Sequence, residues 1–501
     1  MDTNIGLFLE KRALRQPEKL ALWYEGRELT FREWSDRAVR AAGAFHELGV
    51  RKGDRVGLLM TNSPELLECF FGLARIGAIV VPLNWRLAPP ELSYIARAAG
   101  LQTLVYDGDF AATVDAVREE IPVQAYVTVG EGAAGDAAYE ELLARAPEAP
   151  PAAATGTDPL LIMFTSGTTG RPKGAVLTHD NLFYESCSVS FSLDWRVDDR
   201  MLVAMPLFHI GALILVIIGV HVGSTAVLMR EFDPARFLAL VPELGINSFL
   251  AVAAMLGAML QVPAFGETDL SSLRWALCGA APVPVPLIRA WAERSIAIQQ
   301  VYGLTECAGG AALLGPERAL EKAGSTGLPM FHTSIRVVDE EGSDVAAGET
   351  GEVLISAPHV MSGYWDDPEA TAAALRDGWL HTGDLGTLDD EGYLTIVERK
   401  KDLVISGGEN IYPAEVESVL ASLPQLVEAA VIGVPDPDWG EAVCVVARLK
   451  EGETLTLEEV AAHCAGKLGR YKIPKKLVLT EDPLPRTPAG KVLKRVLRET
   501  T

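Results

Sequence analysis

The residues with the clearest chemical potential form one loop, Phe164-Thr165-Ser166-Gly167-Thr168-Thr169-Gly170-Arg171-Pro172-Lys173-Gly174. Its hydroxyls, lysine and backbone N–H groups can donate to phosphate oxygens, and its glycines let the backbone approach a ligand closely. The Walker phosphate loop needs its lysine directly before Ser or Thr, and Lys173 precedes Gly174, so that motif is excluded. Because ordinary surface turns have a similar composition, the loop indicates phosphate binding only together with support from elsewhere.

Further residues of this kind follow short apolar runs later in the chain. Gly279-Ala280-Ala281 follows one run, and Tyr302-Gly303-Leu304-Thr305-Glu306 follows another. The small residues allow close approach to the backbone, the tyrosine ring offers a face to a purine, and Glu306 offers a carboxylate to a divalent cation. Asp384 is expected in a tight turn, where it would accept hydrogen bonds from a ribose. Each of these signals is weak alone.

Three more positions attract attention. Met201–His209 reads as a strand that ends in an aromatic residue and a histidine, and His209 either lines a pocket or is a structural residue. Glu398–Asp402 is a charged cluster typical of an exposed linker. Lys491 follows a Pro/Gly turn close to the C-terminus, where chains are often mobile.

The elements that must position these residues alternate between helical and strand patterns. Residues 159–164 and 175–177 read as strands on either side of the glycine loop, residues 31–48 as a helix and residues 54–60 as a strand. Ser63-Pro64-Glu65 is a helix start with a cap and a proline at the first position. This alternation predicts an α/β fold with helices covering a largely parallel sheet.

Length and composition limit the classes of protein. A chain of 501 residues is longer than the length at which a single hydrophobic core stops growing, so two or more domains are expected. The net charge of -23 argues against nucleic-acid binding. Residues 465–501 nevertheless carry ten Lys or Arg against three Asp or Glu, which indicates either a site for a polyanionic small molecule or a solvated basic face.

The cysteines and the start of the chain predict a cytoplasmic protein. The six cysteines show no paired spacing, which is typical of reduced thiols, and no secretory signal is visible at the N-terminus. Ile210–Met229 is long enough to span a membrane, but glycines and polar residues in its middle predict a buried helix followed by a strand. Arg12, Arg15, Arg196 and Arg200 would supply a surface for peripheral membrane contact.

Together and in this order, these motifs resemble the adenylate-forming superfamily, which includes acyl-CoA synthetases, luciferases and nonribosomal-peptide adenylation domains. Pro206–His209, Ser406–Glu415 and Arg470–Lys476 are most similar to bacterial fatty-acyl-CoA synthetases. The resemblance implies a large N-terminal domain of layered, mostly parallel sheets with helices and a β-barrel-like subdomain, and a small mobile α+β C-terminal domain. The implied boundaries are 1–398, a hinge at 399–401 in which Lys401 falls on the family's hinge position, and 402–501.

The resemblance also assigns roles by matched position. ATP, Mg²⁺ and coenzyme A are implied as co-substrates and metal. The implied catalytic residues are Lys491, Glu306, Thr165 and Lys173, with Glu306 also the metal ligand. The implied ATP and AMP contacts are Thr165, Ser166, Gly167, Thr168, Thr169, Gly170, Lys173, Gly279, Ala280, Ala281, Gln300, Tyr302, Gly303, Thr305, Asp384 and Arg399. The implied acyl-pocket residues are His209 and Val301, and the implied coenzyme A contacts are Gly407, Gly408, Arg470, Lys472 and Lys475.

The reaction implied is a ligase reaction in two halves, in which a carboxylate first forms an acyl-adenylate and coenzyme A then displaces AMP. Because attack of a carboxylate on a polyphosphate brings two anions together, charge neutralisation and alignment should dominate catalysis. Lys491 would bridge the two anions and then leave when the C-terminal domain turns about Lys401. Val301 stands where many family members have glycine, so it would narrow the acyl tunnel.

The expected substrate is a medium- to long-chain fatty acid, because residues 209–220 and 248–259 offer no cation for a second carboxylate. Aryl acids are equally apolar and stay open as an alternative, as does the loading of a carrier protein. A nucleotide-binding regulator without activity would be expected to lack Lys491 or Glu306, and both are present. A monomer and a homodimer are both consistent with the sequence.

Overall fold

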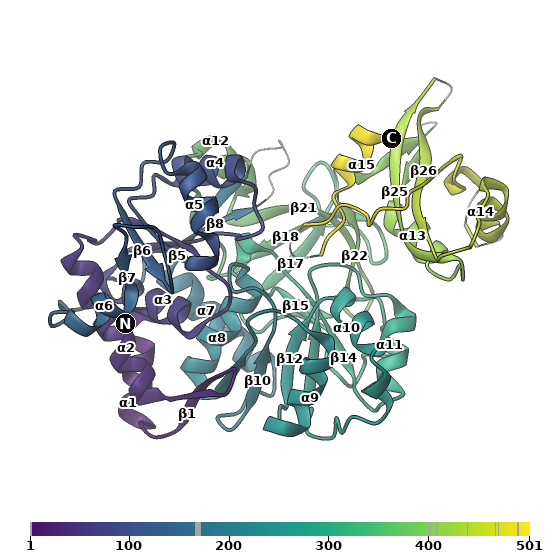
Figure 1. Cartoon of the computed structure of the whole chain (residues 1–501). Helices are drawn as coiled ribbons and strands as arrows, with labels where there is room; N and C mark the ends of the chain where they lie inside the picture. The colour runs from purple at the N-terminus through teal and green to yellow at the C-terminus, as the bar shows by residue number, and fades with distance from the viewer. Residues whose placement is uncertain are drawn as a thin grey trace.

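The computed structural model describes residues 3–165, 172–399, 402–406, 409–437, 439–465, 467–468, 470–487 and 490–501. Figure 1 shows a large body built from the first part of the chain and a smaller one at its C-terminal end. The fold is mixed α/β with parallel sheets, a large N-terminal domain and a small C-terminal domain, which confirms the predicted fold class.

The glycine loop belongs to an eight-stranded sheet whose central strands are parallel and buried on both faces. The three strands at one edge of this sheet pair antiparallel, and the two strands around the loop therefore form a hairpin, as predicted. The strands in spatial order are β19 (Gly363–Tyr364), β9 (Lys173–Thr178), β8 (Pro159–Thr165), β4 (Ile79–Pro82), β3 (Arg55–Leu59), β5 (Thr103–Asp107), β6 (Ala125–Val129) and β7 (Ala137–Ala138).

A nine-stranded sheet carries the second group of predicted site residues. Its strands β1 and β10 to β14 run parallel, so their carboxyl ends meet along one edge, where α/β folds bind ligands. The strands in spatial order are β16 (Leu328–Pro329), β15 (Ala312–Leu313), β14 (Ile298–Tyr302), β13 (Trp275–Cys278), β12 (Ser248–Ala251), β10 (Arg200–Val203), β11 (Thr225–Leu228), β1 (Leu20–Tyr24) and β2 (Arg27–Thr30).

The helices of the N-terminal domain cover these two sheets, and most of them pack with the sheets in one large apolar core, whereas α4 and α5 pack against the eight-stranded sheet in a second, smaller core. The sequence signals at Ser63 and Pro64 are borne out, because the Ser63 side chain accepts from the Leu66 N–H at the start of α3. The helices are α1 (Phe8–Arg15), α2 (Phe31–Glu47), α3 (Pro64–Ile76), α4 (Pro89–Ala99), α5 (Ala111–Val117), α6 (Tyr139–Arg145), α7 (His179–Ser192), α8 (Ile210–Val222), α9 (Pro234–Leu244), α10 (Ala253–Leu260), α11 (Val285–Ala292) and α12 (Pro368–Ala374).

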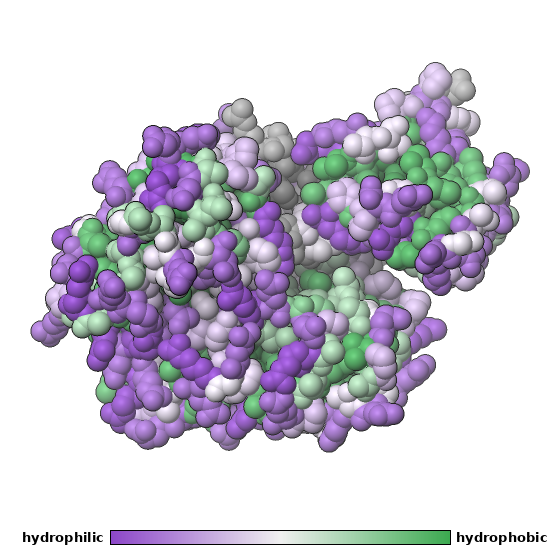
Figure 2. All heavy atoms as spheres, viewed as in Figure 1, coloured by the Kyte–Doolittle hydropathy of each residue, from purple (hydrophilic) through white to green (hydrophobic). Residues whose placement is uncertain are grey.

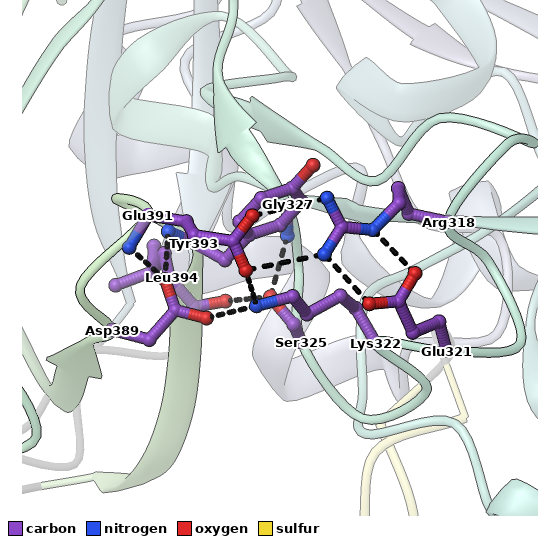
Figure 3. Close-up of polar contacts among 9 residues, drawn as sticks. All are labelled: Arg318, Glu321, Lys322, Ser325, Gly327, Asp389, Glu391, Tyr393 and Leu394. Carbon is purple, nitrogen blue, oxygen red and sulfur yellow. Dashed lines mark hydrogen bonds and ion pairs between the residues drawn. The ribbon is translucent and has the colours of Figure 1, made fainter.

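An antiparallel sheet follows, in the order β17 (Ser334–Val338), β18 (Gly351–Ser356), β21 (Trp379–Leu388) and β20 (Leu375–Arg376), and β22 (Leu394–Arg399) pairs with the second half of β21. A charged cluster fastens the β21–β22 hairpin to the chain before β16 (Figure 3). Arg318 and Lys322 both reach Glu391, and both cations lie over the Tyr393 ring. This cluster fixes the position of the hairpin that carries Asp384.

The C-terminal sheet consists only of residues after 403, in the order β24 (Glu409–Ile411), β23 (Val404–Ser406), β26 (Gly440–Leu449) and β25 (Leu426–Asp436), with β27 (Lys476–Leu479) beside β26. The helices α13 (Pro413–Leu420), α14 (Leu457–Cys464) and α15 (Lys494–Thr500) complete the small domain. In Figure 2 apolar residues gather on its visible side, over β25, β26 and α14, whereas the visible side of the N-terminal domain is mostly hydrophilic.

Two predictions about single segments have clear outcomes. The long apolar segment divides into α8 and β11, as predicted, and no helix among the described residues is long and apolar enough to cross a membrane. The predicted strand Met201–His209 is wrong in its second half, because β10 ends at Val203. Pro206 has no N–H to donate, and the Asn62 side chain bonds the carbonyl of Met205 and the N–H of Leu207, so this stretch leaves the sheet.

Candidate active site

The glycine loop joins β8 to β9, and at this end of the hairpin Thr165 and Lys173 are directly paired in the register. Thr165 Oγ1 donates to Glu306 Oε1 at 3.4 Å, and the Lys173 ammonium lies 5.4 Å from the centre of the Tyr364 ring. The hairpin therefore holds two of the predicted phosphate-binding residues beside Glu306. The predicted residues Ser166, Gly167, Thr168, Thr169 and Gly170 lie outside the described residues.

Glu306 sits in a single 3-10 turn, η4 (Thr305–Cys307), just beyond the carboxyl end of β14. The Tyr364 hydroxyl donates to the same oxygen, Oε1, at 2.9 Å. Tyr364 was missed by the sequence analysis, although an aromatic hydroxyl in a Gly-Tyr-Trp stretch after an apolar strand was a signal that could have found it.

The surroundings of Glu306 fit a magnesium ion that is held mainly by a nucleotide. Within the described ranges no three His, Cys, Asp or Glu side chains come together as a metal site. Mg²⁺ keeps several waters and commonly binds through one or two carboxylates together with substrate phosphates, so a lone carboxylate beside a phosphate loop is a suitable protein ligand. The hydroxyls of Thr165 and Tyr364 both donate to Oε1 and hold the carboxylate in place.

Tyr302 and Asp384 form a buried pair, although they lie in different sheets. The Tyr302 hydroxyl donates to Asp384 Oδ2 at 2.8 Å, and the two residues are 9% and 3% exposed. Burial, and then the Asp384 charge, raise the pKa of Tyr302 well above its usual value, so the phenol stays protonated and acts as a donor. Asp384 thereby keeps one oxygen engaged by protein.

The predicted tight turn at Asp384 is wrong, because the residue lies within β21. The preceding Gly383 has φ +68, and the pairing of β21 shifts on both of its sides, so irregular strand pairing replaces the turn. Asp384 is paired in the register with Arg399 of β22, which brings the backbones of the two predicted ribose-binding residues together.

The predicted adenine contacts lie at the carboxyl ends of β13 and β14. A Cβ at Gly279 would come 2.6 Å from the Val301 carbonyl oxygen, and one at Gly303 would come 1.6 Å from that of Gly309, so neither position has room for a side chain. Ala280 adopts φ +67 between Gly279 and Ala281. Gln300 is buried, and its Nε2 has no hydrogen-bond partner in the part of the chain that the structure describes.

His209 directly precedes α8, whose apolar residues are buried almost throughout. Desolvation, reinforced by the nearby positive charge of Arg86, lowers the pKa of His209 to about 4, so the imidazole is neutral. Its Nε2 is buried without a partner among the described residues. Arg86 was missed, because it lies outside the two apolar segments, 209–220 and 248–259, from which the absence of a cation was inferred.

The loop that carries Lys491 lies against the N-terminal domain. The Thr487 N–H donates to the Lys491 carbonyl at 2.6 Å, and Gly490 has φ +81. A Cβ at Gly490 would lie 3.8 Å from Cγ2 of Val252, the residue after β12. The Lys491 loop therefore sits over the same sheet edge as the residues at the ends of β13 and β14.

The two carboxylates that flank the predicted hinge are buried, in contrast to the exposed linker that was expected. Glu398 is 9% exposed and Asp402 is 6% exposed. Lys494 of α15 pairs with Glu398 at 3.3 Å and with Glu417 at 3.0 Å, and Arg498 pairs with Asp402 at 3.1 Å. These ion pairs explain the burial, because a charge is rarely taken out of water without a partner. Lys401 lies outside the described residues.

The predicted coenzyme A contacts are only partly described, since Gly407 and Gly408 lie outside the described residues. Arg470 and Lys472 lie in the 3-10 turn η6 (Arg470–Lys472), where Lys472 pairs with Glu415 at 2.6 Å. The Lys475 ammonium lies 3.4 Å from the centre of the half-exposed Trp439 ring. Trp439 directly precedes Gly440, which pairs with Ser406, so this missed aromatic ring lies next to the end of β23.

Two family models cover most of the chain. Residues 9–365 match the AMP-binding enzyme model, and residues 415–491 match the model of the AMP-binding enzyme C-terminal domain. The long-chain-fatty-acid–CoA ligase FadD13 of Mycobacterium tuberculosis is 41% identical, with 99% of this chain and 98% of that protein covered. A feruloyl-CoA synthase of an Amycolatopsis species is 42% identical, again with 99% and 98% covered.

Solved structures agree with these matches. The o-succinylbenzoate CoA synthetase of Bacillus subtilis, in complex with its acyl-adenylate intermediate, is 34% identical with a TM-score of 0.89, and 98% of this chain and 97% of that chain are covered. The same enzyme has been seen with ATP and a magnesium ion, in agreement with the predicted ATP, Mg²⁺ and coenzyme A of this type of ligase. The chain belongs to the AMP-binding enzyme family, among the CoA ligases that act through an acyl-adenylate.

Proposed function

We propose that this protein is an ATP-dependent acyl-CoA synthetase whose substrate is a medium- to long-chain fatty acid. The observation that carries the substrate class is α8, which begins directly after His209 and has a run of buried apolar residues and no charged one. A wall of this kind accepts an alkyl chain, and the neutral imidazole of His209 adds no charge to it. The similarity to FadD13 supports the same class.

The predicted site residues then have the following roles in the first half-reaction. Thr165 and Lys173 hold the departing phosphates, together with the loop between them. Tyr302 presents its ring to adenine and holds Asp384 for the ribose hydroxyls. Lys491 bridges the substrate carboxylate and the α-phosphate, so its positive charge offsets the repulsion between them. The magnesium ion neutralises phosphate charge when it is bound at Glu306.

The second half-reaction needs a different arrangement of the small domain. The two domains that move relative to each other are residues 1–398 and 402–501, and residues 399–401 are the hinge. When the small domain turns about this hinge, it withdraws Lys491 from the site. Gly407 and Gly408 then face the pantetheine arm, and Arg470, Lys472 and Lys475 lie toward the coenzyme A phosphates. The position of the Lys491 loop against Val252 supports assigning the present arrangement to adenylation.

A second candidate is a CoA ligase for an aromatic acid. The feruloyl-CoA synthase is as similar to this chain as the fatty-acid ligase is, and over the same share of the sequence. Arg86 favours this candidate, because its charge near His209 would suit a substrate with a polar group at its far end. Val301, which packs over Gly279, would narrow the entrance for the bulkiest acids in either case.

The experiment that separates the candidates is pyrophosphate release with MgATP over straight-chain acids from acetate to stearate, plus benzoate, coumarate and ferulate, with and without coenzyme A. The fatty-acid proposal expects a maximum at a medium or long chain that rises when coenzyme A is added. Activity confined to the aromatic acids would overturn it in favour of the second candidate. Adenylation that coenzyme A cannot discharge would identify a carrier protein as the acceptor.

A further inference from the structure

Helix α7 carries a completely buried carboxylate, Glu185, that the mechanism above does not use. Its Oε1 accepts from the Gly310 N–H at 2.6 Å, and its Oε2 contacts Nδ1 of His359. His359 is also fully buried, and its Nε2 lies 3.1 Å from the Thr333 hydroxyl. Glu185 therefore joins two separate segments, one after Glu306 and one before β19.

The segment around His359 is held by α7 at three points. One helical turn before Glu185, the Asn181 side chain donates to the carbonyl of Pro358 at 3.0 Å and to the carbonyl of Val360 at 2.8 Å. These two carbonyls flank His359, so side chains one turn apart on α7 bind the backbone and the side chain of the same short segment. The segment is thereby fixed to the helix.

Glu306 is attached to both segments that Glu185 joins. Its backbone carbonyl accepts from the Met361 N–H at 2.8 Å, and its carboxylate accepts from the Tyr364 hydroxyl at 2.9 Å. On the other side Gly310 is four residues away from Glu306, at the end of a turn that bonds Glu185. Glu185, and the segment that it anchors, therefore connect α7 to Glu306 on two sides.

The turn between Glu306 and Gly310 has an unusual backbone that needs such an anchor. Ala308 adopts φ +58 and Gly309 adopts φ +134, and the left-handed conformation is costly for a residue with a side chain. Without the bond from Gly310 to Glu185, this turn could relax toward ordinary angles and carry Glu306 with it. The hydrogen bond to a buried carboxylate is stronger than one between neutral groups, which suits this holding role.

We propose that Glu185 is a positioning residue that fixes the Glu306 carboxylate for the magnesium ion of MgATP. The inference rests on the proposed function, because it assigns Glu306 to the metal. Groups that orient a metal ligand typically change metal affinity by about 10- to 100-fold when they are removed. Removal of Glu185 should therefore weaken the binding of the divalent cation and leave the acid-binding region unchanged.

The test compares Glu185→Ala with Glu185→Gln. Affinity for Mn²⁺, as a probe for Mg²⁺, is measured by electron paramagnetic resonance in the presence of the non-hydrolysable α,β-methylene analogue of ATP. Glu185→Ala should bind Mn²⁺ at least about 10-fold more weakly. Glu185→Gln keeps an oxygen for the Gly310 N–H and an amide for His359, so it should stay within about threefold of the wild type.

A matched control separates positioning from general damage. Glu68 is also completely buried, with hydrogen bonds from Tyr139 and Arg37, and it lies in α3, away from Glu306. Glu68→Ala should lower the melting temperature without changing Mn²⁺ affinity. If Glu185→Ala does not fold, Thr333→Val takes its place in the test. This variant removes one hydrogen bond from His359 and should lower the affinity for Mn²⁺ by a smaller factor.

The outcomes are distinguishable from those of the proposed function. Unchanged Mn²⁺ affinity in folded Glu185→Ala, or in Thr333→Val where Glu185→Ala does not fold, would overturn the positioning role. The positioning role would also be overturned if Glu68→Ala lost as much affinity for Mn²⁺ as Glu185→Ala does. Because the wild-type cation affinity is measured without any acid, failure of every acid in the substrate panel would refute the proposed function and leave this result standing.

Discussion

The buried imidazole of His209 predicts an acid-sensitive contribution to stability. Its pKa falls from an ordinary 6.5 to about 4 in the folded protein, because desolvation, and then Arg86, disfavour the charged form. The unfolded chain binds a proton below pH 6.5 and the folded protein does not until about pH 4. The group therefore stabilises the fold above pH 6.5, and this stabilisation is lost as the pH falls from 6.5 to 4.

The size of this effect follows from the shift. At 1.36 kcal/mol for each pKa unit, the depression is worth about 3 kcal/mol over that pH range. His209→Phe keeps a ring of similar size and removes the titration, so its free energy of unfolding should fall about 3 kcal/mol less than that of the wild type between pH 6.5 and pH 4. Part of the wild-type slope should remain, because the pKa of His221 is also lowered to about 4, by desolvation and then by Arg12.

Urea unfolding followed by circular dichroism at several pH values measures this difference directly. The reasoning would be refuted if His209→Phe and the wild type lost equal stability over this range. Such a result would mean that the folded protein takes up a proton at His209 as readily as the unfolded chain does.

Three further predictions concern the hinge region, the nucleotide and the acyl entrance. Lys494→Met should lower the free energy of unfolding by about 3–5 kcal/mol in denaturant titrations, because it removes a buried ammonium that pairs with both Glu398 and Glu417; a loss below about 1 kcal/mol would contradict the ion-pair account. Tyr302→Phe should raise the KM for ATP about 10-fold in steady-state assays and leave the KM for the acid unchanged, because Asp384 loses a buried hydrogen bond. Val301→Gly should raise kcat/KM for the bulkiest acids about 10-fold relative to short ones, and an unchanged profile would show that this side chain does not limit the entrance.

The local sequence signals that proved accurate rest on short-range physics. The hairpin around the glycine loop, the start of α3 at Ser63 and Pro64, and the division of the long apolar segment all follow from residues close together in the chain. Caps, prolines and apolar periodicity act over a few residues, so one sequence is enough to read them.

The misplaced residues depended on partners far away in the sequence. The expected strand before His209 ends early because Asn62, more than 140 residues earlier, binds its backbone. The expected turn at Asp384 is a strand because β18 and β22 pair with it on both sides. The burial of Glu398 needs Lys494 from the end of the chain. No local pattern carries these contacts.

The site itself was readable as a set of residues but not as a geometry. The order of the motifs pointed to the residues that meet at the sheet edge, because the family resemblance already contained their arrangement. Tyr364, Arg86 and Trp439 were missed, since each gains its meaning from a distant neighbour: Glu306, His209 and Lys475 respectively.

The measurement that tests the central claim most directly is a comparison of the two half-reactions in Lys491→Ala. Pyrophosphate release from MgATP and the acid measures the first half, and thioester formation from supplied acyl-adenylate and coenzyme A measures the second. The account predicts a loss of about 100-fold or more in the first half, because the cation between two anions is gone, and a second half within about threefold of the wild type. Equal losses in both halves would contradict the assignment of Lys491 to adenylation alone and, with it, the proposed turn of the C-terminal domain.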